Sequence, residues 1–150
     1  AQRYEIPGHY IVLEILEGLA LENPEQVSER IGQLHAHGFR ISMDDFGTGH
    51  SSLNTLSQIP IDELRLDRSF LLQAHRSKEY NRRKILEVVI EVAKRLHIST
   101  VAEGIETAEH VQLMQEMHCD YGQGYYYSKP IPAERFTKTF LLPNAQSADL

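Results

Sequence analysis

The stretch ISMDDFGTGHSSL, residues 41–53, holds the pattern that decides the fold. It begins as an apolar run, ends that run with the adjacent carboxylates Asp44 and Asp45, and continues through a Gly-Thr-Gly turn toward a short helical pattern. An apolar run followed by a glycine-rich turn and a helix is typical of a strand–loop–helix unit. Because two neighbouring carboxylates repel each other, the stretch also indicates that a cation lies nearby.

The alternation of strand and helix patterns continues on both sides of this stretch. Strands are expected at residues 10–16, 40–44, 63–66, 99–103 and 124–127, and helices at residues 24–37, 51–58, 79–96 and 107–117 and from residue 132 onward. Alternating elements predict an α/β fold with a parallel sheet. Five βα units are fewer than the eight of a closed barrel of about 250 residues. The chain is therefore either an open doubly wound sheet or the C-terminal part of a TIM-like (β/α)8 barrel.

Capping residues and periodicity support these helices. Asn23 and Thr107 are N-cap residues, and Pro24 occupies the first helical position after Asn23. The helix expected at residues 79–96 has the amphipathic pattern, with four apolar residues on one face: Ile85, Val88, Val92 and Leu96. Residues 143–150 are small and polar and are predicted to be disordered, so the domain covers residues 1–142.

The charge, the cysteine content and the lengths of the apolar runs exclude several classes of protein. The 150 residues carry a formal net charge of −6, which argues against binding a nucleic-acid polymer and fits a protein that gathers divalent cations. Cys119 is the single cysteine, so the chain has no internal disulfide and no multi-cysteine zinc site, as expected of a reduced, cytoplasmic protein. No apolar run approaches the ~20 residues of a membrane span, and we expect no membrane contact by this segment.

Ionisable residues collect where the predicted strands end. Since side chains two apart in a strand share a face, each of the first four strands places a charged residue on the face opposite its apolar side chains. An acid at a strand end can instead cap the following turn, but four strands in succession follow the same rule. The rim would hold one cation, Arg65, and seven carboxylates: Glu14, Glu17, Asp44, Asp45, Asp67, Glu103 and Glu106. Such a set predicts a bound divalent cation, with Mg²⁺, Mn²⁺ or Ca²⁺ favoured over zinc.

Other patterns are interpreted more simply. The Asp-Phe-Gly of residues 45–47 lacks the glycine-rich loop, strand lysine and HRD motif of a protein kinase. His35 and His37 lie two apart on a helix and do not share a face. The tyrosine run at residues 125–127 is expected to pack within a strand rather than to stack on bases.

Five motifs, in order, resemble those of the EAL-domain cyclic di-GMP phosphodiesterases. They are LEILE at 13–17, DDFGTGHSSL at 44–53, LRLDRSF at 64–70, VAEGIET at 101–107 and DYGQGYYYSKPIP at 120–132. The resemblance implies the C-terminal portion of a TIM-like barrel that opens cyclic di-GMP, a bacterial second messenger, to linear pGpG. The cofactor it implies is Mg²⁺ or Mn²⁺, as one or two ions, whose bound hydroxide attacks phosphorus.

The resemblance also assigns roles to individual residues. Glu14 and Asp44 correspond to metal ligands and Asp45 to a ligand of a second metal ion. Glu103 is the expected general base, and Asp67 joins it in holding metal-bound water. Three further residues are expected to assist: Glu17 anchors the loop after the aspartate pair, Glu106 supports the metal ligands, and Gln123 contacts metal or substrate.

This chain departs from the family pattern at three places. Arg65 stands where the family has a lysine that positions the attacking water, and Gly49-His50-Ser51 replaces Gly-Tyr-Ser. The Glu-Ala-Leu motif and a metal-binding asparagine do not occur in these residues. We therefore expect the 150-residue chain alone to be inactive, and we expect the missing N-terminal half of the barrel, or another chain, to complete it. A homodimer is implied through the loop and helix after Asp45.

Two alternatives stay open. A degenerate EAL domain would act as a non-catalytic sensor of cyclic di-GMP or as a protein-interaction module. A Mg²⁺-dependent barrel enzyme of the enolase type also collects acids at strand ends, but it needs a lysine or histidine base.

Overall fold

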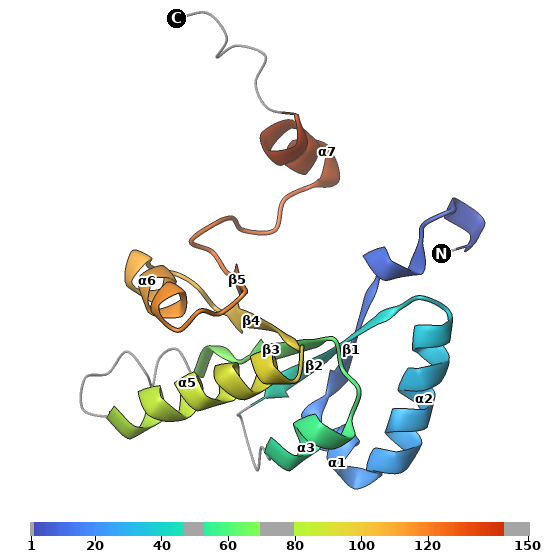
Figure 1. Ribbon diagram of the computed structural model, residues 1–150. Helices are drawn as coiled ribbons and strands as arrows, with labels where there is room; N and C mark the ends of the chain where they lie inside the picture. Colours follow the sequence, from blue (N-terminus) through green and yellow to red (C-terminus); the bar gives the residue numbers. More distant parts are fainter. Residues whose placement is uncertain (1, 47–52, 70–79, 143–150) are drawn as a thin grey trace, which may run out of the picture.

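The computed structural model describes residues 2–46, 53–69 and 80–142. Its centre is a parallel sheet in which each strand pairs with the next one along the chain (Figure 1). The strands are β1 (Val12–Leu16), β2 (Arg40–Phe46), β3 (Glu63–Leu66), β4 (Ser99–Glu103) and β5 (Tyr121–Gln123). The strand order β1-β2-β3-β4-β5 is that of a barrel wall, whereas a doubly wound sheet reverses its order at a switch point. The doubly wound alternative is thereby excluded.

Helices connect the strands. They are α1 (Glu17–Glu22), α2 (Pro24–Ala36), α3 (Leu53–Gln58), α5 (Tyr80–Arg95), α6 (Ala108–Glu116) and α7 (Ala133–Phe136), with 3-10 turns at Gln2–Tyr4 and Gly8–Tyr10 and a π-helix at Thr137–Leu141. Both predicted N-caps are confirmed, since the Asn23 side chain accepts a hydrogen bond from the Gln26 amide and Thr107 accepts one from the His110 amide. Figure 1 shows α7 standing apart from the sheet, beyond the segment that follows β5. None of the described helices has the length and apolarity needed to span a bilayer.

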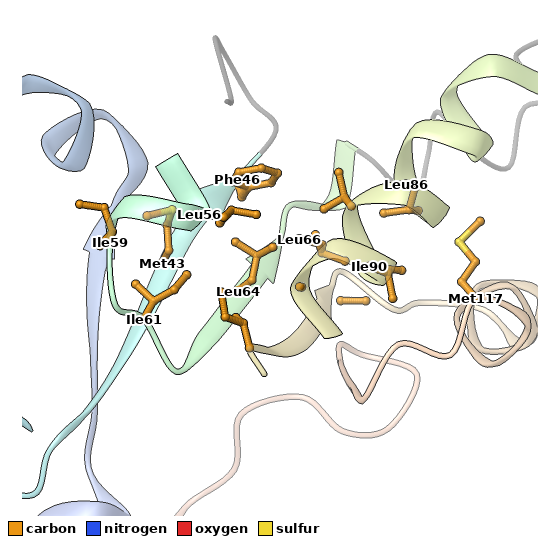
Figure 2. Packing of buried hydrophobic residues seen from close by; sticks show 14 of the residues in the cluster. Met43, Phe46, Leu56, Ile59, Ile61, Leu64, Leu66, Leu86, Ile90 and Met117 are labelled. Atoms are coloured by element: carbon orange, nitrogen blue, oxygen red, sulfur yellow. The ribbon is translucent and has the colours of Figure 1, made fainter. Parts of the chain in front are cut away.

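The hydrophobic core lies on one face of the sheet. Ile41 and Met43 of β2 and Leu64 and Leu66 of β3 are fully buried there, as the alternation of the strands predicts. Figure 2 shows Met43, Leu64 and Leu66 together with side chains from the helices, among them Leu86 and Ile90. The opposite face is left to the polar residues of the same strands.

Helix α5 buries a different face from the one that its apolar pattern suggested. Ile85, Val88 and Leu96 do share a face with Val92, but these three side chains are exposed, Ile85 by 54%. The buried positions are Leu86, Val89, Ile90 and Ala93. Both sets have helical spacing, and the buried set follows the i, i+3, i+4, i+7 repeat of a core-facing stripe.

The fifth strand was expected at residues 124–127, and this expectation is wrong. The strand is Tyr121–Gln123, and the chain then turns, with the Tyr127 amide donating to the Gly124 carbonyl. Gly124 passes so close to the backbone of Ile105 that a Cβ atom would lie 2.1 Å from the Ile105 carbonyl oxygen. This close approach ends the ladder, and it leaves Tyr125, Tyr126 and Tyr127 exposed rather than packed within a strand.

Smaller differences concern element ends. The first strand begins at Val12 because Gly8–Tyr10 forms a 3-10 turn, and β2 runs on to Phe46, two residues beyond Asp44. The loop at residues 47–52, with His50, and the tail at residues 143–150, expected to be disordered, lie outside the described residues.

Candidate functional site

Five neighbouring strands place polar side chains at one rim of the sheet, on the face opposite the core. Glu14 comes from β1, Asp44 from β2, Arg65 from β3, Glu103 from β4 and Gln123 from β5. The strands are parallel, with Leu16 opposite Asp44 and Glu103 opposite Gln123, and the β2–β3 register shifts between Met43 and Phe46. Because the carboxyl ends of parallel strands meet at one edge, residues up to 109 positions apart in the chain come together there.

Arg65 is the centre of this cluster. Its Nε donates a hydrogen bond of 2.6 Å to Glu103 Oε1, and its Nη1 donates one of 2.7 Å to Glu14 Oε1. Its Nη2 donates a bond of 2.9 Å to Gln123 Oε1 and also pairs with Glu103. Asp44 Oδ1 lies 3.7 Å from Nε. One guanidinium group therefore bridges β1, β4 and β5 and lies beside the carboxylate of β2.

The surroundings of Arg65 keep it charged. Its side chain is only 14% exposed, and this burial by itself would lower the pKa of Arg65. The hydrogen bond and the charge of Glu103, followed by the charges of Glu14 and Asp44, outweigh the burial and raise the pKa of Arg65 above its ordinary value. The guanidinium is a permanent cation at this rim.

A deeper acidic residue, Glu63, was not singled out from the sequence. Its Oε1 accepts a hydrogen bond of 3.2 Å from the buried Ser42 hydroxyl, and its carboxylate lies 3.8 Å from Arg40 Nη2 and 4.0 Å from Arg65 Nη1. Glu63 precedes Arg65 by two positions on β3, so both residues point to the same face. The two-residue spacing from Arg65 could have identified Glu63 from the sequence.

The remaining predicted site residues are not partners of Arg65 in the described part of the chain. Glu17 is buried at the start of α1. Asp45 has a φ of 59°, and its amide donates to Asp44 Oδ1. Asp67 accepts a 2.8 Å hydrogen bond from the Ser69 amide. Glu106 accepts one of 2.8 Å from Arg68.

The Arg68–Glu106 ion pair connects the loop after β3 to the loop after β4. Gly104, which directly follows β4, has a φ of 69° and would place a Cβ atom 2.6 Å from Arg68 Cγ. Only glycine combines this conformation with so close a neighbour. The Gly104 position thus lets Arg68 cross the end of β4 and reach Glu106.

The side chains at this rim are of the types that bind a metal ion, but where the structure describes them, their positions do not form a metal site. Carboxylate oxygens such as those of Glu14, Asp44 and Glu103 are the ligands that Mg²⁺ and Mn²⁺ prefer. Within the described residues, however, no three acidic, histidine or cysteine side chains converge closely enough to hold one ion. Glu14 and Glu103 are instead held on different nitrogen atoms of Arg65.

A groove borders the rim at Gln123. It has a volume of about 540 Å³, and its lining includes four aromatic residues. Lys129 brings a positive charge to this groove, with its Nζ atom 5.6 Å from the centre of the Tyr125 ring. The lining includes Gln123, Tyr125, Tyr127, Lys129, Phe136 and Phe140. Flat aromatic surfaces beside a cation suit a planar, anionic ligand.

Comparison with known proteins identifies the family. The family profile described as EAL domain matches residues 1–130. The chain is 37% identical over 82% of its length to the cyclic di-GMP phosphodiesterase NbdA of Pseudomonas aeruginosa. It is 40% identical over 81% of its length to the probable cyclic di-GMP phosphodiesterase PdeG of Escherichia coli.

Solved structures agree with these relatives. The structure described as the PaMucR phosphodiesterase in complex with c-di-GMP aligns with 90% of the chain at a TM-score of 0.80 and 33% identity. The chain spans 54% of that structure, 16% of NbdA and 24% of PdeG. The sheet is therefore part of a TIM-like barrel, and the chain belongs to the EAL-domain family.

Proposed function

We propose that this chain forms part of a cyclic di-GMP phosphodiesterase, which hydrolyses one phosphodiester bond of cyclic di-GMP to give linear pGpG. The observation that carries the proposal is the convergence of Glu14, Asp44, Glu103 and Gln123 at the rim where β/α barrels place their active sites. The names of NbdA and PdeG, and the c-di-GMP complex of PaMucR, support the same substrate.

The groove beside Gln123 supports a nucleotide ligand. Guanine is planar and stacks on aromatic rings, and the phosphates of cyclic di-GMP are anionic. Tyr125 and Phe136 offer aromatic surface in this groove, and Lys129 offers positive charge. In this arrangement the base would lie against the aromatic rings and a phosphate beside Lys129.

Within this proposal Glu103 is the general base, and Arg65 orients it. Both contacts from Arg65 reach Glu103 Oε1, so Oε2 is the oxygen that would take the proton from water. Asp67 is proposed to hold the attacking water with Glu103. Gln123 is proposed to contact the substrate, while Glu17 and Glu106 support the loops on either side.

Mg²⁺ or Mn²⁺, as one or two ions, remains the proposed cofactor, with Glu14, Asp44, Asp45 and Asp67 as its ligands. The support for this is the chemistry of the oxygen donors. Within the described residues, the arrangement around Arg65 does not group these ligands.

A second candidate function has its own support. The contacts of Arg65 with Glu14 and Glu103 occupy two of the residues that hydrolysis would need. A degenerate EAL domain, acting as a non-catalytic sensor of cyclic di-GMP or as a protein-interaction module, accounts for these contacts, and we propose that the 150 residues alone do not turn the substrate over.

Apolar surface near β1 supports a proposed covering segment. Leu16, Leu19 and Leu21 are exposed there, and a groove of about 290 Å³ lies between α1 and α2. We propose that further polypeptide, either the other part of the barrel or another chain, covers this side. A homodimer through the loop and helix after Asp45, and a cytoplasmic location, remain proposals as well; residues 47–52 of that loop lie outside the described residues.

The test is turnover of cyclic di-GMP by the intact protein with Mn²⁺ or Mg²⁺, followed as the appearance of pGpG. Glu103→Gln should lower turnover by about 100-fold or more, because general-base catalysis contributes at least that much. Glu29→Gln, a matched change at an exposed position of α2, should leave turnover unchanged. Binding of cyclic di-GMP without turnover, in the presence of either metal, would favour the sensor instead.

A further inference from the structure

The guanidinium of Arg65 lies where a cation shared by the strand ends would lie. Its three nitrogen atoms are directed to three different strands: Nη1 to Glu14 on β1, Nε to Glu103 on β4 and Nη2 to Gln123 on β5. Asp44 on β2 approaches the same group at 3.7 Å. No other described side chain bridges these strands in this way.

Charges confirm that Arg65 serves the carboxylates as a counterion. Four carboxylates lie within 4.0 Å of its nitrogen atoms, namely those of Glu14, Asp44, Glu63 and Glu103. Arg40, at 3.8 Å from Glu63, is the additional cation among the described contacts of this group. The cluster keeps an excess of negative charge, so it still attracts cations from solution.

A metal ion and the guanidinium cannot both use the same oxygen atoms. Mg²⁺ holds its oxygen ligands at about 2.0–2.1 Å, so an ion bound by both Glu14 and Glu103 would lie in the space between them. Arg65 now fills that space and bonds to one oxygen of each carboxylate. Two cations in contact would also repel each other strongly at a partly buried site.

We propose that Arg65 is an internal cation that competes with a divalent metal ion for Glu14 and Glu103. Arginine stays protonated at any accessible pH, so the metal can gain these ligands only when the side chain swings away. Lysine at the same position carries its charge on a single flexible nitrogen atom and can yield more easily. The inference rests on the proposed metal site and does not depend on hydrolysis.

The test is Mn²⁺ binding to the intact protein without cyclic di-GMP, measured by the electron paramagnetic resonance signal of free Mn²⁺. Arg65→Gln should bind Mn²⁺ at least about 10-fold more tightly than the unaltered protein, because a nearby positive charge is removed. Arg65→Lys should lie between the two. Arg135→Gln removes an equal charge from the exposed surface of α7 and should change affinity by less than about twofold.

A double variant tests whether the gain in Mn²⁺ affinity depends on Glu14. Adding Glu14→Gln to Arg65→Gln should abolish the gain in Mn²⁺ affinity, since it removes one of the released ligands. Circular dichroism shows whether each variant is folded, and if Arg65→Gln is unfolded, Arg65→Lys against the unaltered protein decides.

Equal or weaker Mn²⁺ binding by the folded Arg65 variants would overturn the competition, and so would the absence of Mn²⁺ binding by all of them. Tighter binding without any pGpG formation would instead uphold the competition and count against the phosphodiesterase proposal alone.

Discussion

A single guanidinium group holds the rim together because its nitrogen atoms point in different directions. Arg65 reaches Glu14, Glu103 and Gln123 at once, and the distances of 2.6–2.9 Å are those of charge-assisted hydrogen bonds. Lysine could make such bonds only from one nitrogen atom. The contacts therefore depend on the shape of the side chain as well as on its charge.

Glu63 lies next to Arg65 on the same face of β3, and removing the charge of Glu63 should destabilise the protein. Its carboxylate is nearly buried, accepts a hydrogen bond from Ser42 and lies near Arg40 and Arg65. Glu63→Gln keeps the shape but removes the charge, so we expect the free energy of unfolding to fall by about 1–3 kcal/mol in urea denaturation. Glu29→Gln should change it by no more than about 0.5 kcal/mol. Equal stability of the two variants would contradict a role for Glu63.

At the level of elements, the turn after β5 is set by contact with the loop after β4. The Ile105 amide donates to the Gln123 carbonyl at 3.0 Å, and the Tyr126 amide donates to the Ile105 carbonyl at 2.9 Å. Gly124 lies between these two bonds. This contact fixes the end of β5 and, with it, the position of Gln123 beside Arg65.

Gly124→Ala should disrupt that turn. Its Cβ would lie 2.1–2.6 Å from backbone atoms of Ile105, which cannot move aside as a flexible side chain can. We expect a loss of about 2 kcal/mol or more in the free energy of unfolding, as for other overpacked sites. Gly32→Ala is the matched control, because no atom beyond its chain neighbours and the surrounding helix backbone lies within 4 Å of its Cβ position in α2, and it should stabilise the protein by about 0.5–1 kcal/mol. A harmless Gly124→Ala change would show that the close approach is not required.

The stability contributed by the Arg83–Glu116 pair, which joins α5 to α6, should depend on pH. A hydrogen bond from Arg83, helped by one from Gln112, lowers the pKa of Glu116. A lowered pKa in the folded protein stabilises it above the unfolded pKa of about 4.5, and this contribution is lost as the pH falls through the lower folded value. Because the pair is exposed, the effect should be small and sensitive to salt.

Thermal unfolding of Arg83→Gln and of the unaltered protein checks this dependence. The difference between their melting temperatures should be measurable at about pH 7, and it should shrink as the pH falls below the unfolded pKa of about 4.5 and through the lower folded pKa of Glu116. A difference that stays the same over this pH range would show that Arg83 acts through packing and not through its acidic partners Glu116 and Glu87.

Local patterns in the sequence predict the elements that local forces form. The caps at Asn23 and Thr107 and the bounds of β3 and β4 follow from neighbouring residues, and all are confirmed. The α/β class and the barrel assignment follow from the alternation of elements and from the family motifs.

Contacts between distant residues were harder to foresee. Ile85 and Leu86 are equally apolar, and only packing against the sheet decides that Leu86 is buried. The end of β5 depends on Ile105, 19 residues before Gly124. From the repulsion among the rim carboxylates, the sequence predicts a bound metal ion. The hydrogen bond between Arg65 and Glu103 could not be predicted in this way, because the two residues are 38 positions apart in the chain.

For the whole molecule, the strand order links the fold to the proposed function. A sheet whose strands follow chain order brings all its carboxyl ends to one rim, so residues from Glu14 to Gln123 lie close together. The groove that begins at Gln123 extends this rim by aromatic surface and one lysine. Both the enzyme and the sensor require cyclic di-GMP to bind there.

Isothermal titration of the intact protein with cyclic di-GMP and Mn²⁺ is the most direct test of this site, with Glu103→Gln present in every sample so that the ligand is not hydrolysed during the titration. The protein with Glu103→Gln alone should bind cyclic di-GMP, and adding Lys129→Gln should weaken binding by about 10-fold, because it removes a positive charge from the groove. Lys138→Gln, an equal change at an exposed position of the π-helix, should have little effect. An absence of binding, or binding that both variants leave unchanged, would contradict the assignment of this rim and groove to cyclic di-GMP.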